Sequence, residues 1–264
     1  MTSITFLAAA ILTPTPVASA ESPDIKAALE RPIIVADQTL HDVQQFVESR
    51  IPPVPMATDA QNWQETANRL RRDVLDRVVF RGEARAWRDM PLRVEWLDTI
   101  DGGQGYRIRK LRYEAVPGLW IPALLYEPDR LNGKVPVSLH VNGHDRKGKA
   151  AEYKQIRSIN LAKRGIIVLN PEWLGMGQLS DAGYRHGSMN QLDLCGTSGL
   201  APFYLAMSRG LDLLLDHASA DPSRVAVSGL SGGGWQTIII SSLDTRVTSR
   251  CRTGMHPSIP WQSN

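Results

Sequence analysis

The spacing of apolar residues changes along the chain, and each spacing predicts a different element. Residues 63–78 place apolar side chains every three or four positions, which predicts a helix of about five turns. From Leu92 the spacing falls to two, which predicts antiparallel strands over residues 92–96, 106–115 and 119–126. The apolar stripe of the predicted helix consists of Trp63, Ala67, Leu70, Val74 and Val78.

The second half alternates strand and helix patterns. Strands are predicted at 135–141, 165–170, 221–229 and 246–253, with helices at 151–164, 203–215 and 232–242 between them. The first of these helices should turn Tyr153, Ile156 and Ile159 inward and end at Gly165. This rhythm predicts an α/β fold with a mostly parallel sheet, helices on both faces and antiparallel entry strands.

The N-terminal part predicts two segments before this domain. Residues 1–20 carry no charge, include an apolar run over 4–12 and end in Ala18-Ser19-Ala20, which is typical of a signal peptide. We therefore expect export to the periplasm or outside the cell. Residues 21–90 form a helical lead-in, and residues 91–264 form the α/β domain. No other segment approaches membrane-spanning length, so we expect no stable membrane insertion.

Charge and cysteine content exclude several classes of function. The chain has 30 basic and 27 acidic residues, and this balance does not favour nucleic acid as a partner. Cys195 and Cys251 have neither the CxxC nor the Cys/His spacing of a metal site, so we interpret both as structural.

The segment GLSGGG is the strongest chemical signal. Gly229, Ser231 and Gly233 match G-x-S-x-G between a predicted strand and a predicted helix, the context of a nucleophile elbow. Small residues flank the serine because the turn is crowded. Its hydroxyl should stand above the sheet edge, and the Gly232 N–H should point to where an oxyanion forms.

Other interpretations of the glycines and of a second serine fit less well. The spacing is not that of a dinucleotide fingerprint, and no lysine follows as in a P-loop, so we expect no cofactor. Purely structural glycines remain an alternative. Ser198 in CGTSG follows no strand and precedes a helix with Pro202 near its start, which favours helix capping.

A second oxyanion donor is predicted in the loop NGHD. Gly143 allows the backbone to turn, so that the His144 N–H faces Gly232. His140, His144 and Asp145 could instead bind a metal, but only if the strand continued through Gly143. We expect no metal, and His140 should be a hydrogen-bonded strand histidine.

Several segments together resemble the α/β-hydrolase superfamily, and within it the acetyl xylan esterase, dienelactone hydrolase and prolyl oligopeptidase-like branch. They are VNGHD, LNPEWLGMGQ, DPSRVAVSGLSGGGWQT and SSLDTRV, within residues 92–247. The resemblance implies that Ser231 is the nucleophile and that the Gly232 and His144 amides form the oxyanion hole. It implies a small-molecule or carbohydrate ester as substrate, for example acetyl groups on polysaccharide.

The remainder of the motif set departs from that family. Its chain order is serine, acid, histidine, but after Ser231 the only candidates are Asp244, at the far end of the next helix, and His256. His256 is a weak candidate because it follows the first strand after the serine. We therefore expect a serine esterase whose triad acid, base and C-terminal strands are absent from this chain, which would be inactive. The alternatives are a non-catalytic hydrolase-like binding domain and a peptidase of prolyl oligopeptidase type.

Overall fold

The computed structural model describes residues 23–180 and 185–253. The predicted signal peptide lies outside these residues. The chain divides into two compact units, Met1–Met56 and Ala57–Asn264, each defined by the contacts among its own residues. The first contains α1 (Pro23–Leu29) and α2 (Gln38–Glu48), and α2 has no buried residue. In the described part of the chain, no helix is both long and apolar enough to cross a membrane.

The second unit begins with α3 (Ala60–Val74), the helix predicted from the apolar stripe. The Asp59 side chain caps it by accepting the Asn62 N–H at 2.8 Å. At its end the chain forms a single π-helical turn, η1 (Leu75–Val79). The wider turn shifts the helical phase by one residue. Val79 is therefore buried, whereas Val78, which the stripe predicted to face inward, is 48% exposed.

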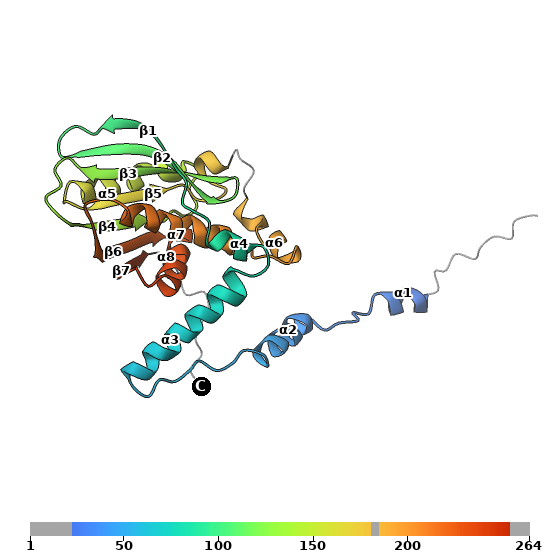
Figure 1. The fold of residues 1–264 in the computed structure, drawn as a ribbon. Helices are drawn as coiled ribbons and strands as arrows, with labels where there is room; N and C mark the ends of the chain where they lie inside the picture. Colours follow the sequence, from blue (N-terminus) through green and yellow to red (C-terminus); the bar gives the residue numbers. More distant parts are fainter. Residues whose placement is uncertain (1–22, 181–184, 254–264) are drawn as a thin grey trace, which may run out of the picture. The chain divides into compact units, whose positions relative to one another are not determined.

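One seven-stranded sheet forms the centre of the unit (Figure 1), in the order β1-β2-β3-β5-β4-β6-β7. Strands β1 to β3 and the β3–β5 pair are antiparallel, whereas β5, β4, β6 and β7 run parallel. The predicted α/β class and antiparallel entry are thus confirmed. The strands are β1 (Val94–Asp101), β2 (Tyr106–Val116), β3 (Leu119–Pro128), β4 (Val135–His140), β5 (Ile167–Pro171), β6 (Ala220–Leu230) and β7 (Ser249–Thr253).

Helices cover both faces of this sheet. On one face α7 packs on β2, β4, β5 and β6, and α8 packs beside it on β6 and β7. On the other face α5 packs on β3 and β5. The helices and short turns are α4 (Ala84–Arg88), η2 (Gly148–Ala150), α5 (Glu152–Ala162), η3 (Gly177–Leu179), η4 (His186–Ser188), α6 (Gln191–Leu194), α7 (Ala201–Leu215) and α8 (Gly232–Leu243).

The orientation of α5 differs from the prediction. Tyr153 and Ile156 are exposed, and the stripe that faces the sheet consists of Lys154, Ser158 and Ala162. This stripe can be buried because its polar groups have local partners. Lys154 Nζ donates to the carbonyl of Gly148 at 2.9 Å, and the Ser158 hydroxyl donates to the Lys154 carbonyl at 2.9 Å. The prediction was therefore wrong for Tyr153 and Ile156, whereas Ile159 is partly buried against the core cluster of Ile108, Tyr126, Ala162 and Val168.

Candidate active site

Ser231 lies at the junction of β6 and α8, on a strained turn. Its backbone has φ 56° and ψ −117°, which side-chain-bearing residues rarely adopt. Helix α8 begins at the next residue, Gly232, as the sequence predicts. Ser231 is exposed, so its hydroxyl is accessible beside the first amides of the helix.

The glycines around Ser231 are required by close backbone approach. A Cβ at Gly229 would lie 2.3 Å from the carbonyl oxygen of Gly233. A Cβ at Gly233 would lie 2.5 Å from the carbonyl oxygen of Val141, on the loop after β4. No side chain fits at either position, which gives the G-x-S-x-G spacing a steric cause.

The loop after β4 lies directly against this turn. A Cβ at Gly143 would lie 2.6 Å from the carbonyl oxygen of Leu230 and 3.0 Å from the amide nitrogen of Gly232. The next residue, His144, is exposed. The two residues predicted to supply oxyanion donors thus come from segments in contact with each other.

Side-chain amides hold this loop on both sides. Gln236 on α8 donates from Nε2 to the Asn142 carbonyl. Asn142 donates from Nδ2 to Asn170 Oδ1 at 2.7 Å and to the Pro171 carbonyl at 2.5 Å. These bonds join the loop to the end of β5 and to the second turn of α8, so its backbone is fixed next to Ser231.

Three rings gather over the start of α8. The ring of Trp173, from the loop after β5, faces Gly232, where a Cβ would lie 2.5 Å from its Cη2 atom. Trp173 stacks on His186 with centroids 4.6 Å apart and meets the edge of His144 at 4.7 Å. The Nε2 atoms of His144 and His186 are 2.9 Å apart. One of these two nitrogens must carry the shared proton and the other accept it.

A buried ion pair lies beside these rings. Glu172, next to Trp173 in sequence, accepts from the Lys149 backbone N–H and from Lys149 Nζ, both at 2.8 Å. The Lys149 ammonium also donates to Gln178. The Glu172 side chain is 1% exposed and that of Lys149 is 9% exposed. The pair therefore connects the loops after β4 and β5, each of which also supplies a ring near Ser231.

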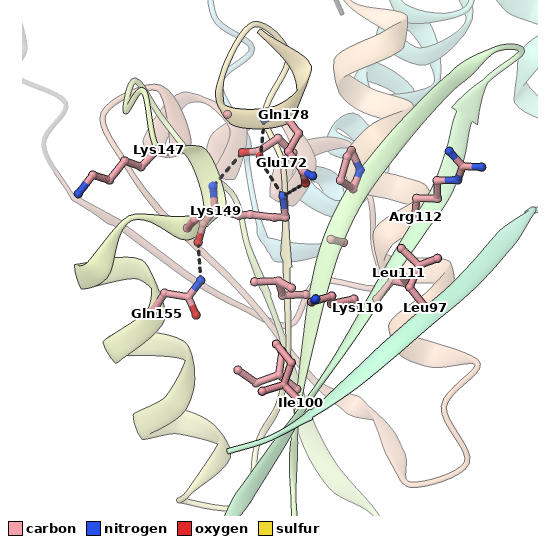
Figure 2. Close-up of a pocket in the computed structure, with 16 residues that line it drawn as sticks. Leu97, Ile100, Lys110, Leu111, Arg112, Lys147, Lys149, Gln155, Glu172 and Gln178 are labelled. Atoms are coloured by element: carbon pink, nitrogen blue, oxygen red, sulfur yellow. Dashed lines mark hydrogen bonds and ion pairs between the residues drawn. The ribbon is translucent and has the colours of Figure 1, made fainter. Parts of the chain in front are cut away.

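The same two loops line a cavity of about 630 Å³. Figure 2 shows Lys149 between Glu172 and Gln178 at one end of this cavity, and the side chains of β1 and β2 at the other. Its apolar wall includes Leu97, Ile100 and Ile108. Ser231 does not line it, so this cavity is separate from the proposed nucleophile.

The residues of the metal alternative, His140, His144 and Asp145, are not grouped around one point. His140 is buried, and its Nδ1 accepts from Arg157 Nε at 3.2 Å and lies 3.0 Å from Ser158 Oγ. Burial, with the Arg157 charge, holds the pKa of His140 well below its usual value. His144 instead contacts His186. In residues 23–180 and 185–253, no three His, Cys, Asp or Glu side chains are grouped as metal ligands.

The remaining candidates lie away from Ser231 or outside the described residues. Ser198 is buried and its Oγ accepts the Leu200 N–H at 3.3 Å, at the start of α7. Asp244 follows the last turn of α8, about 18 Å along the axis at 1.5 Å per residue. Its carboxylate pairs with Arg246 at 2.6 Å. His256 lies outside the described residues. Cys195 is a free, exposed thiol, so it has no packing role.

Sequence reasoning missed the ring cluster and the buried ion pair. Trp173 and Glu172 lie within LNPEWLGMGQ, a segment that points to a family resemblance but assigns neither residue a role. A usable signal was present, because an acidic residue and a tryptophan directly follow a strand predicted to be buried on both faces. His186 gave no signal, since no predicted element adjoins it.

Comparison with known proteins supports the fold. No family model matches the chain, and no curated protein is significantly similar to it. Solved structures do match, with probability 1.00. A Bacteroides fragilis protein assigned as an acetyl xylan esterase superposes with a TM-score of 0.67 at 19% identity, over 83% of this chain and 60% of its own.

Two other structures agree. A methylesterase gives a TM-score of 0.56 at 21% identity, over 81% of this chain and 45% of its own. Acetyl xylan esterase 1 from a Thermoanaerobacterium species gives 0.55 at 18% identity, over 74% of this chain and 62% of its own. The chain thus spans 45% to 62% of the length of these structures. Together with the sheet order and the strained serine turn, these matches show that the chain has the α/β-hydrolase fold.

Proposed function

We propose that the protein is a serine hydrolase of carboxylic esters that acts through an acyl-enzyme on Ser231. The observation that carries this proposal is the exposed Ser231 at φ 56°, with the Gly143 loop packed against its turn. Ser231 Oγ attacks the ester carbonyl, the Gly232 and His144 amides stabilise the oxyanion, and water releases the acid. The hydrolase domain comprises residues 91–264.

The substrate is proposed to be an acetyl ester of a polysaccharide. The support is the fold shared with two structures named as acetyl xylan esterases. Export by the segment 1–20 agrees with a polysaccharide substrate, because such polymers lie outside the cell. Both points are proposals, since the chain spans 60% of the length of the first of these structures.

The triad acid and base are proposed to lie outside the residues placed around Ser231. Within the described residues, no histidine is hydrogen-bonded to Ser231, and Asp244 is engaged by Arg246. The same observation favours a second candidate, a non-catalytic hydrolase-like binding domain. The two candidates differ in whether Ser231 reacts with an electrophile.

Covalent labelling distinguishes them. We would treat the purified chain with an alkyl fluorophosphonate and locate the adduct by peptide mass mapping. An adduct on Ser231 that disappears in Ser231→Ala but persists in Ser198→Ala is the expected result. Ser198 is a matched control because it is a serine before a helix, but buried. Absence of any adduct on Ser231 would favour the binding domain.

A further inference from the structure

We infer that the indole of Trp173 determines the length of the acyl group that Ser231 accepts. This inference rests on the proposed function and adds to it a limit on the substrate. It concerns a residue outside the G-x-S-x-G motif, on the loop after β5.

The position of the ring gives the first argument. The six-membered edge of Trp173 faces Gly232, since a Cβ there would lie 2.5 Å from Cη2 and 2.8 Å from Cζ3. In the acyl-enzyme the carbonyl carbon must lie close to the Gly232 amide for its oxygen to accept that N–H. The first carbons of the acyl group are therefore within contact range of this edge.

The second argument is that the ring cannot easily move. Trp173 is 5% exposed and belongs to the main apolar core. His186 covers its face at an interplanar angle of 20°, and His144 meets it at 81°. The preceding residue, Glu172, is fixed by Lys149. A longer acyl chain would have to displace a packed indole, whereas a short chain would not.

The size of the effect follows from the discrimination that hydrophobic pockets show between substrates of different length. A hydrophobic pocket discriminates between two substrates that differ by one methylene by about 10-fold to 200-fold in kcat/KM. Replacing indole by a methyl group removes most of the obstruction. The ratio of acetate to hexanoate reactivity should therefore fall by at least about 10-fold in Trp173→Ala.

The test measures single-turnover acylation of Ser231 by p-nitrophenyl acetate and p-nitrophenyl hexanoate. In this step Ser231 Oγ bonds to the acyl carbon, p-nitrophenolate leaves and is detected, and the serine proton passes to the solvent. We would compare the chain with Trp173→Ala, Trp173→Phe and Trp235→Ala. Trp235 is the matched control, because it is a tryptophan on α8 whose ring packs on Phe203 at 5.5 Å instead.

The expected result is a lower acetate-to-hexanoate ratio in Trp173→Ala, an intermediate ratio in Trp173→Phe and an unchanged ratio in Trp235→Ala. Equal ratios in the chain and in a folded Trp173 variant would overturn the inference. If Trp173→Ala fails to fold, Trp173→Phe decides. If neither ester acylates Ser231, the proposed function and the inference both fail. An intact reaction with unchanged ratios overturns the inference alone.

Discussion

The carboxylate of Glu172 binds both the backbone and the side chain of Lys149. Its Oε1 accepts the Lys149 N–H and its Oε2 accepts Nζ, each at 2.8 Å. Glycine is required on two sides, because a Cβ at Gly148 or Gly177 would lie 1.9 Å or 2.4 Å from the carboxylate oxygens. The enclosed pair holds together the two loops that flank Ser231.

Removing one partner of this pair should strongly destabilise the fold. Glu172→Gln keeps the shape but leaves the Lys149 ammonium buried without a counter-charge, so the free energy of unfolding should fall by about 3 kcal/mol. Urea denaturation measures this change. The double variant Glu172→Gln/Lys149→Met should recover most of the loss. A single variant as stable as the parent chain would refute the interpretation.

The Gly143 loop should control the reactivity of Ser231. In Gly143→Ala the new Cβ would lie 3.0 Å from the Gly232 amide nitrogen, so the loop and the oxyanion donors must separate. Fluorophosphonate labelling of Ser231 should slow by about 100-fold, as expected when an oxyanion donor is lost. Gly187→Ala is the control, since no atom lies within 4 Å of its added Cβ. Equal labelling rates in both variants would contradict the assignment.

The π-helical turn after α3 predicts opposite effects at neighbouring valines. Val79→Ala removes a buried side chain and should lower the free energy of unfolding by about 2 kcal/mol. Val78→Ala should change it by less than about 0.5 kcal/mol, because Val78 is 48% exposed. Thermal or urea unfolding of the two variants checks this. Similar losses of stability in both variants would mean that α3 continues as a regular α-helix, without the π-helical turn.

Glu127 should make stability depend on acid pH. Burial by itself would raise its pKa, but hydrogen bonds from His217 and Arg107 and the nearby Arg109 charge lower the pKa to about 2, from 4.5. The stabilisation is therefore fully present above about pH 4.5 and is lost as the pH falls towards 2. At about 1.4 kcal/mol per pKa unit it amounts to about 3 kcal/mol.

Urea titrations between pH 7 and pH 2 test this dependence. Glu127→Gln should be less stable at pH 7 and should show a smaller loss of stability between pH 4.5 and pH 2 than the parent chain. Glu95→Gln is the control, since Glu95 lies on the edge strand β1 and forms an exposed ion pair with Arg112 on β2. Parallel curves for the parent chain and Glu127→Gln would exclude a role for this carboxylate.

Turnover should be slow even where Ser231 can be acylated. Among the described residues Ser231 has no histidine partner, and loss of the triad base lowers turnover by about 10⁶-fold. An oxyanion hole alone can leave about 10³-fold catalysis over water. We expect slow p-nitrophenyl acetate hydrolysis that Ser231→Ala abolishes and His256→Ala leaves unchanged. Rapid hydrolysis lost in both variants would identify His256 as the base.

The fold could be predicted because its signals are local. Strand β5 is a buried, mostly apolar run, β6 has apolar residues from Val225 to Val227, and α7 repeats buried residues at helical spacing. Each element is therefore recognisable without knowledge of its neighbours. The turn at Ser231 was predicted for the same reason. At Gly229 the atom that excludes a side chain is close in sequence, the Gly233 carbonyl oxygen, whereas at Gly232 and Gly233 the excluding atoms belong to Trp173 and Val141.

The errors arose where tertiary contacts choose between two local solutions. The π turn moved the buried position from Val78 to Val79, and hydrogen bonds allowed α5 to bury Lys154 and Ser158 in place of Tyr153 and Ile156. Neither outcome can be predicted from apolar spacing, because such a prediction assumes that every polar residue is exposed and that every helix is regular.

The sequence by itself therefore determined the order of the elements, the α/β class and the serine turn, since backbone propensity and hydrophobic spacing act over short distances. Only the tertiary structure decided which residues surround Ser231. Trp173 and His186 come from the connection between β5 and α7, and Lys149 comes from the loop after β4. Their proximity depends on parallel strands that end at the same edge of the sheet. Contacts of this kind join residues far apart in the chain, so no local pattern specifies them.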